Sequence, residues 1–180
     1  MKKEILILVD KNDKKIGEAE RGECHGIKAR LHRAFLILVF NKRGQLYVQK
    51  RSKFKKLWPG FWDGSVASHV YLGESYNKAT KRRLKQELGI SCPLKMAFKF
   101  NYFAKYKDTR SEPSRTIGAE KEVCSIFIGK YNKDIKPNKK EAAWGKFIDL
   151  EEVILDTKKN PGKYTPWFLI TLRKKKIEYT

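Results

Sequence analysis

Short apolar runs alternate with polar turns along this chain, and their lengths are typical of strands. Glu4–Val9 is an apolar run that ends at an Asp-Lys-Asn-Asp turn, and Ala34–Phe40 has the length and branching of a buried strand. The turn at Asn41–Gly44 leads into a second run, Leu46–Arg51. These two runs and the turn between them predict a β-hairpin.

A helix is predicted at Ser75–Leu88, because Ala79, Leu84 and Leu88 fall on or near one helical face and Gly89 provides a stop. The remaining predicted elements are strands at Lys95–Phe103 and Glu122–Tyr131, a polar loop at Lys107–Ala119, and helices at Leu150–Asp156 and Trp167–Lys176. Together they predict an α+β fold in which helices sandwich a mixed β-sheet. The length of 180 residues favours a single domain spanning residues 1–180.

Composition supports a packed, water-soluble fold. Hydrophobic residues make up 41% and aromatic residues 12% of the chain, which is typical of a packed core and not of disorder. No apolar run reaches the roughly 18–20 residues of a membrane span, and the N-terminus has too few apolar residues for a signal peptide. Three cysteines, Cys24, Cys92 and Cys124, form neither an even set nor a CxxC pair, which favours a reducing, cytoplasmic location.

The formal net charge of +21 indicates an anionic partner. A basic nucleic-acid-binding module is the non-enzyme alternative, and it predicts binding that falls steeply with salt. However, the lysines are dispersed over the whole chain, with short clusters only at Lys136–Lys140 and Arg173–Lys176, and no recognised nucleic-acid motif is present. The sequence therefore favours a small anionic substrate over nucleic acid. It does not distinguish a monomer from a homodimer.

Histidines and glutamates form the first candidate site. The three histidines, His25, His32 and His69, lie near predicted strand ends or loops. Glu120 and Glu122 are two residues apart at the start of a strand, so both carboxylates face the same side. Three imidazoles and two carboxylates would suit Mn, Mg or Zn. The alternative is three scattered surface histidines and a solvated acidic strand end.

Cationic and aromatic residues form a second candidate site. Arg83 and Glu87 are four residues apart on the predicted helix, which is typical of a surface ion pair but also of a diphosphate site with a Glu-held Mg²⁺. Basic residues also follow the hairpin, where a solvated loop is the alternative: Arg51, Lys53, Lys55 and Lys56. The aromatic residues Trp58, Trp62, Tyr102 and Trp167 are typical of a core, although one could stabilise a positive centre through its π face.

Residues 73–90 resemble a degenerate Nudix box. The family pattern is G-x5-E-x7-R-E-U-x-E-E-x-G-U, where U is aliphatic, and the chain has Glu74 followed seven residues later by RRLKQELGI. Three positions depart from the pattern: Ser68 replaces the first glycine, Arg83 the glutamate after arginine, and Gln86 one glutamate of the final pair. The resemblance implies a Nudix fold but weakens the case for an ordinary Nudix hydrolase, which needs the full acidic cluster.

A more specific resemblance, to type I isopentenyl-diphosphate isomerases, extends nearly end to end through RLHRAF, KKLWPGFWDGSV, H-x3-GES, RRLKQELG, EKEVC and YTPWFL. It implies conversion of isopentenyl to dimethylallyl diphosphate, with Mg²⁺ and a second divalent metal, Mn²⁺ or Zn²⁺. The implied ligands of the second metal are His25, His32, His69, Glu120 and Glu122. Glu87 would help to hold Mg²⁺ on the substrate, and the implied diphosphate ligands are Arg21, Arg51, Lys55 and Arg83. In this reaction the substrate double bond is protonated to a carbocation, which Trp167 would face. Glu122 and Tyr102 would act at the reacting carbons.

One position conflicts with this assignment. The family's second proton-transfer group is a cysteine, and the matching residue here is Ala67, which can neither donate nor accept a proton. Three outcomes stay open: weak isomerase activity in which Tyr102, Ser68 or water substitutes, hydrolysis of a diphosphate by an isomerase-like Nudix hydrolase, or binding without turnover. The pattern at Trp62–His69 resembles hydrolase relatives that lack the cysteine.

Overall fold

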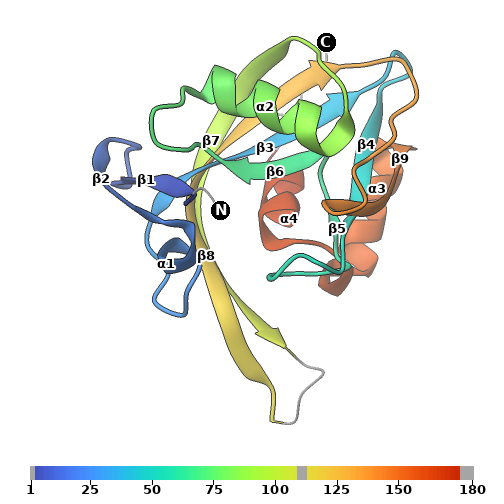
Figure 1. Ribbon diagram of the computed structural model, residues 1–180. Coiled ribbons are helices and arrows are strands. Elements are labelled where there is room, and N and C mark those ends of the chain that lie inside the picture. The colour runs from blue at the N-terminus through green and yellow to red at the C-terminus, as the bar shows by residue number, and fades with distance from the viewer. Residues whose placement is uncertain (1–2, 109–112, 175–180) are drawn as a thin grey trace.

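The computed structural model describes residues 3–108 and 113–174 (Figure 1). Its strands are β1 (Ile5–Val9), β2 (Lys15–Glu20), β3 (His32–Phe40), β4 (Gln45–Arg51), β5 (Trp62–Asp63), β6 (Val66–His69), β7 (Leu94–Asp108), β8 (Arg115–Lys130) and β9 (Ala142–Asp149). Its helices are α1 (Arg21–Cys24), α2 (Tyr76–Leu88), α3 (Leu150–Lys159), the 3₁₀ turn η1 (Pro161–Lys163) and α4 (Pro166–Arg173).

The strand β3 organises the sheet. It runs parallel to β8 over its full length and antiparallel to β6, and it also pairs with β1 and β4. The strand β4 continues the sheet toward β5 and β9. On the other side of β8, the strand β7 forms a long antiparallel hairpin whose end projects from the body of the molecule (Figure 1). The sheet is therefore mixed, as predicted.

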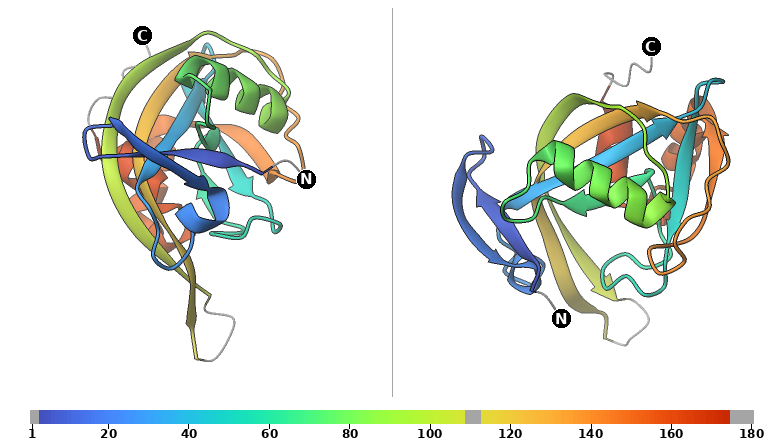
Figure 2. Two further views of the ribbon diagram at one scale, coloured as in Figure 1. Left: turned by 60° about the vertical axis from the view of Figure 1, so that its left-hand side comes forward. Right: turned by 45° about the horizontal axis from the view of Figure 1, so that its top comes forward.

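Both faces of β3 are buried, which explains its unbroken apolar sequence. Phe35, Ile37 and Val39 pack with the apolar side of α2. The alternate residues, beginning with Leu36 and Leu38, pack on the opposite side with residues of α3 and α4. The two further views in Figure 2 show α2 crossing one face of the sheet, while α3 and α4 lie on the other. Helices on both faces confirm the predicted sandwich.

The predicted helix at Ser75–Leu88 is confirmed. The Ser75 hydroxyl accepts a hydrogen bond from the Lys78 amide at 3.3 Å, and Gly89 ends α2 with a φ of 71°. Ala79 and Leu84 are fully buried, so the apolar face is as predicted. In the described part of the chain, no helix is long and apolar enough to cross a membrane.

The prediction of a loop at Lys107–Ala119 is wrong for most of that segment. The strand β7 continues to Asp108 and β8 begins at Arg115, with Tyr106 opposite Gly118, because the two strands pair beyond the end of their apolar alternation. Residues 109–112 of that loop lie outside the described residues, as do the last two residues of the helix predicted at Trp167–Lys176. The strands β2 and β9 and the short helix α1 were not predicted, since their sequences lack a clear apolar period.

We expect Leu38→Ala to lower the free energy of unfolding by about 2–5 kcal/mol, because the side chain is fully buried between the sheet and the C-terminal helices. Leu155→Ala is the matched control, since Leu155 is 54% exposed, and we expect a change within about 0.5 kcal/mol. Urea denaturation followed by circular dichroism measures both. Equal losses in the two variants would contradict the assignment of this core.

Candidate functional site

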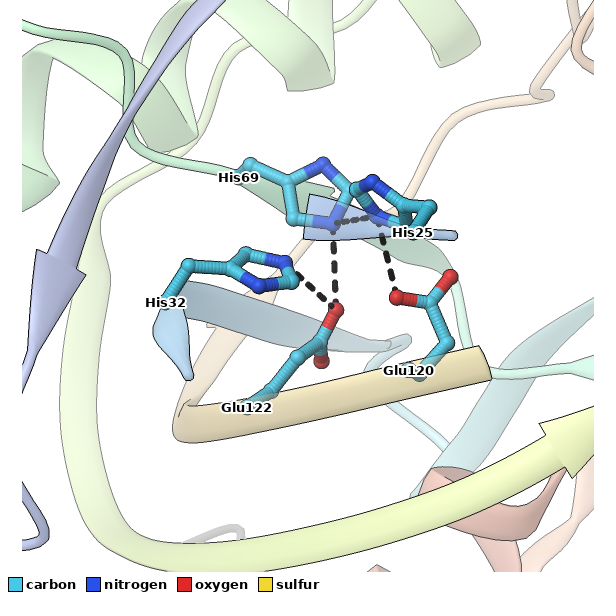
Figure 3. A group of neighbouring side chains, drawn as sticks. All are labelled: His25, His32, His69, Glu120 and Glu122. Atoms are coloured by element: carbon cyan, nitrogen blue, oxygen red, sulfur yellow. Dashed lines mark hydrogen bonds and ion pairs between the residues drawn. The ribbon is translucent and has the colours of Figure 1, made fainter. Parts of the chain in front are cut away.

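Three histidines and two glutamates meet at one point near the end of the sheet (Figure 3). They are His25, His32, His69, Glu120 and Glu122, and one ligand atom from each lies within 4.8 Å of all the others. All five side chains are buried. The alternative of scattered surface histidines is therefore excluded.

Strand register brings these residues together. Parallel pairing of β3 with β8 places Glu122 beside His32, and antiparallel pairing of β3 with β6 places His69 beside Ala34. Glu120 shares the face of Glu122 because side chains alternate along a strand. Four of the five residues are thus positioned by three neighbouring strands.

A backbone contact to β8 positions the fifth residue, His25. The Ala119 amide donates to the His25 carbonyl oxygen at 3.2 Å. Gly118 lies so close that a Cβ atom there would be 2.4 Å from the same oxygen. Glycine is therefore required at position 118 for His25 to reach the cluster.

Hydrogen bonds to backbone carbonyls orient two of the imidazoles. The carbonyl oxygens of Arg21 and Arg30 can only accept, so His25 and His32 donate from Nδ1, at 2.6 and 2.8 Å. Their Nε2 atoms consequently face the cluster. His25 Nε2 lies 3.0 Å from His69 Nε2 and 2.9 Å from Glu120 Oε2, and His69 Nε2 lies 3.0 Å from Glu122 Oε1.

This donor set fits a divalent metal. Two of its atoms, His32 Nε2 and Glu120 Oε2, are buried without a hydrogen bond among the described residues, because the proton of the nearby His25 ring is on Nδ1, and this is costly unless a cation binds there. Neighbouring ligand atoms that are about 2.0–2.2 Å from one ion lie roughly 3 Å from each other, which matches the three shortest spacings given above. The backbone acceptors behind His25 and His32 are the usual outer partners of metal-bound imidazole.

The two carboxylates differ electrostatically. Burial would raise the pKa of Glu122, but its contacts with His32 and His69 hold that pKa well below the usual range. Burial, and then the charge of Glu122, raise the pKa of Glu120. The two carboxylates therefore cannot both ionise easily without a compensating positive charge.

A cavity of about 460 Å³ adjoins this cluster. Tyr102, Ala67 and Trp167 line it together with Glu122, and the Tyr102 hydroxyl donates to Glu122 Oε2 at 2.6 Å. Burial, and then the charge of Glu122, raise the pKa of Tyr102 well above its ordinary value, so the phenol keeps its proton. The Tyr102 and Trp167 rings lie 6.1 Å apart and give the cavity an aromatic side.

Asp63, a buried residue, holds Trp167 in place. Its Oδ1 accepts hydrogen bonds from Trp167 Nε1 at 2.8 Å and Thr165 Oγ1 at 3.0 Å, and its Oδ2 accepts from Arg51 at 3.1 Å. Asp63 is fully buried and is not part of the cavity lining. The Trp62-Asp63 pair, taken in the sequence as a hydrolase feature, therefore has a structural role in this chain.

Arg51, an implied diphosphate ligand, also makes structural contacts. Its guanidinium donates to Asp63 and to the carbonyl oxygens of Leu57 and Trp58 at 2.9 and 3.0 Å, and it lies 5.2 Å from the centre of a Trp167 ring. Arg51 does line the cavity. Its hydrogen bonds, however, organise the loop after β4 and support Trp167.

The other implied diphosphate ligands line the same cavity, and we call Arg21, Lys55 and Arg83 its cationic end. Each of them pairs with a carboxylate. Glu4 accepts from Arg21 at 2.9 Å, and Glu141 pairs with both Lys55 and Arg83. Neither glutamate was identified from the sequence, although each is an isolated acid in a basic segment.

Glu87 does not join the histidine cluster. It is 1% exposed, and its Oε1 accepts from Arg83 Nη2 at 2.6 Å. The structure thus pairs Arg83 and Glu87 on α2 as the four-residue spacing predicted, but with both groups directed at each other. A Mg²⁺ site at Glu87 stays a prediction.

The family comparison agrees with this geometry. Residues 30–168 match the family model of the Nudix domain. The chain belongs to the Nudix family.

Several relatives of this Nudix protein are isopentenyl-diphosphate Delta-isomerases. Two from Photorhabdus laumondii are 35% and 38% identical, each over 92% of this chain and 90% and 88% of their own lengths. One from Escherichia coli is 33% identical over 94% of this chain and 90% of its own. Within the Nudix family, this chain therefore belongs with the isopentenyl-diphosphate isomerases.

Solved structures show the same fold. A Deinococcus radiodurans protein matches with a TM-score of 0.73 at 20% identity, over 94% of this chain and 98% of that one. The MutT protein of Methanosarcina mazei matches with a TM-score of 0.62 at 19% identity, over 82% of this chain and 94% of that one. The predicted Nudix fold is confirmed.

The altered Nudix box of this protein now has a structural explanation. Arg83, where the family pattern has glutamate, lies on α2 and lines the cavity. Gln86 is exposed and accepts from Arg82 and Arg83 at 3.3 and 3.2 Å. The box therefore contributes a cation to the cavity where a hydrolase would have acidic metal ligands.

We expect Asp63→Ala to lower the free energy of unfolding by about 3–5 kcal/mol, because it leaves Arg51 and the Trp167 indole buried without their acceptor. Asp134→Ala removes an exposed aspartate and should change stability by about 0.5 kcal/mol or less. Chemical denaturation compares the two variants. If Asp63→Ala is no more destabilising than its control, Asp63 does not organise this side of the cavity.

Proposed function

We propose that this protein is an isopentenyl-diphosphate isomerase that converts isopentenyl to dimethylallyl diphosphate. One observation carries the proposal: a single cavity has a cationic end for the diphosphate and an aromatic side beside Glu122 and Tyr102 for the hydrocarbon. The names of the relatives support the same substrate. The protein would act as one Nudix domain over residues 1–180.

The reaction needs two proton transfers and a stabilised cation. Protonation of the terminal double bond gives a tertiary carbocation, and loss of a proton from a neighbouring carbon completes the shift of the double bond. Trp167, fixed by Asp63, would present its π face to that cation. Glu122, whose Oε2 accepts a hydrogen bond from the Tyr102 hydroxyl, would move a proton to or from the substrate.

Ala67 lines the cavity at the position of the family's second proton-transfer cysteine. Cys124 also lines the cavity, two residues after Glu122 on β8 and on the same face of that strand. Burial also raises the pKa of Cys124 well above its ordinary value. The second proton would therefore pass through water or Ser68, and we expect slow turnover.

A divalent metal would be held by the three histidines with Glu120 and Glu122. An ion there would neutralise the buried carboxylates and fix the position of Glu122, and its donor set suits Mn²⁺ or Zn²⁺. A separate Mg²⁺ would accompany the diphosphate near Glu87. The unpaired cysteines are consistent with the cytoplasmic location inferred from the sequence.

Diphosphate hydrolysis is the second candidate, and Ala67 is the observation that favours it. The Nudix box of this chain argues against it, since Arg83 and Gln86 occupy positions where the family pattern has glutamates. A nuclear magnetic resonance assay separates the two. The purified protein is incubated in D₂O with isopentenyl diphosphate, Mg²⁺ and either Mn²⁺ or Zn²⁺. Deuterated dimethylallyl diphosphate supports isomerisation, phosphate release supports hydrolysis, and an unchanged spectrum contradicts both.

In the same assay, we expect Ala67→Cys to raise the isomerisation rate by a factor on the order of 10²–10⁴, because it restores a proton-transfer group at the position of the family's cysteine. Ala67→Ser is the matched control, since it adds a group of similar size that is far less acidic. A gain confined to the thiol variant is expected. Equal rates in the cysteine variant and the present chain would show that the cavity serves another substrate.

We expect Glu122→Gln to reduce the divalent metal bound per chain by at least about tenfold, because it removes one charged ligand and leaves the shape unchanged. Elemental analysis after dialysis measures this without any activity assay. Glu18→Gln removes an exposed glutamate on β2 and should leave the metal content unchanged. Unaltered metal content in Glu122→Gln would mean that the ion binds elsewhere.

A further inference from the structure

Glu141 occupies the space between two cations of the cavity. Its Oε2 contacts the Lys55 ammonium, and its Oε1 lies 3.2 Å from Arg83 Nη2. All three side chains line the cavity. One carboxylate therefore uses a separate oxygen for each cation, as two oxygens of a bound diphosphate would.

The backbone holds Glu141 in this place. The Ser52 amide, just after β4, donates to the Glu141 carbonyl oxygen at 3.0 Å, and the Glu141 amide donates to the Asn138 carbonyl at 2.9 Å. Asn138 in turn donates from its amide to the Glu87 carbonyl at 2.7 Å. The segment before β9 is thus tied to the strand that precedes Lys55 and to the helix that carries Arg83.

The carboxylate is charged in this position. Burial would raise the pKa of Glu141, but the charges of Lys55 and Arg83 lower it below its ordinary value. Arg83 is also paired with Glu87, so the two carboxylates more than balance its charge. An incoming anion meets cations that are already neutralised.

We propose that Glu141 is an internal counter-ion that takes the place of the substrate diphosphate between Lys55 and Arg83 and is displaced when the substrate binds. The inference rests on the proposed function for the identity of the ligand, and it adds a residue that sets the affinity and selectivity of the cationic end. An anion must offer oxygens to both cations to displace a carboxylate that contacts both. A diphosphate meets this requirement, whereas a monatomic anion such as chloride does not.

Removing the charge of Glu141 should therefore strengthen anion binding. Inorganic diphosphate is titrated into the purified protein by isothermal calorimetry in buffer without added Mg²⁺. We expect Glu141→Gln to bind it about five- to tenfold more tightly than the unmodified chain does, because one competing, partly exposed charge is lost. Glu151→Gln removes an exposed glutamate of α3 and should leave the affinity within about twofold.

Glu141→Asp is a second variant that keeps the charge but shortens the side chain, so it cannot bridge both cations. We expect it to bind diphosphate at least about twofold more tightly than the unmodified chain, and it decides the question if Glu141→Gln does not fold. Unchanged or weaker binding in the folded variants, with clear binding by the unmodified chain, would overturn this inference alone. Absence of diphosphate binding in every variant would overturn the proposed function and this inference with it.

Discussion

The parallel pairing of β3 with β8 is the constraint on which the site depends. Because His32 lies opposite Glu122 in this register, a shift of one residue would turn either side chain to the other face of the sheet. The register is fixed by burial: β3 is apolar on both faces, and one face packs on α2 while the other packs toward α3 and α4. The hydrophobic cores therefore determine where the candidate metal ligands meet.

Buried charge is the second constraint, and the chain satisfies it mostly with residues that do no chemistry. Asp63 neutralises Arg51 and orients Trp167, and Glu141 accompanies Lys55 and Arg83. In the histidine cluster, by contrast, the two glutamates face imidazoles at 2.9–3.5 Å, and His32 Nε2 and Glu120 Oε2 make no hydrogen bond among the described residues. The partners of the buried polar groups thus distinguish positions where the protein supplies the counter-charge from a position where a ligand would supply it.

Much of the fold and the cluster could be predicted from sequence. The continuous run of β3 and the capped, periodic helix α2 are strong local signals, and the spacing of Glu120 and Glu122 places both on one face without any tertiary information. The residue types left open whether the three histidines join them, and the family resemblance then implied that they do. Strands β2 and β9 lack a clear apolar alternation, so neither was predictable by pattern.

The supporting carboxylates were missed for a different physical reason. Asp63 meets Trp167 across 104 residues, and Glu141 meets Lys55 across 86, so no local spacing links the partners. The net charge of +21 indicates cationic sites but does not indicate which acids pair with those cations.

The residues that give the cavity its shape do not depend on the side chain at position 67. The residues that shape the cavity, among them Trp167 and the cationic end, are held by hydrogen bonds and ion pairs that do not involve position 67. Loss of the thiol therefore removes a proton-transfer group without removing an element of the structure. Substrate affinity and turnover should accordingly depend on different residues, with affinity set by the cations and their counter-ions and turnover set by Glu122 and whatever donor reaches the side of Ala67.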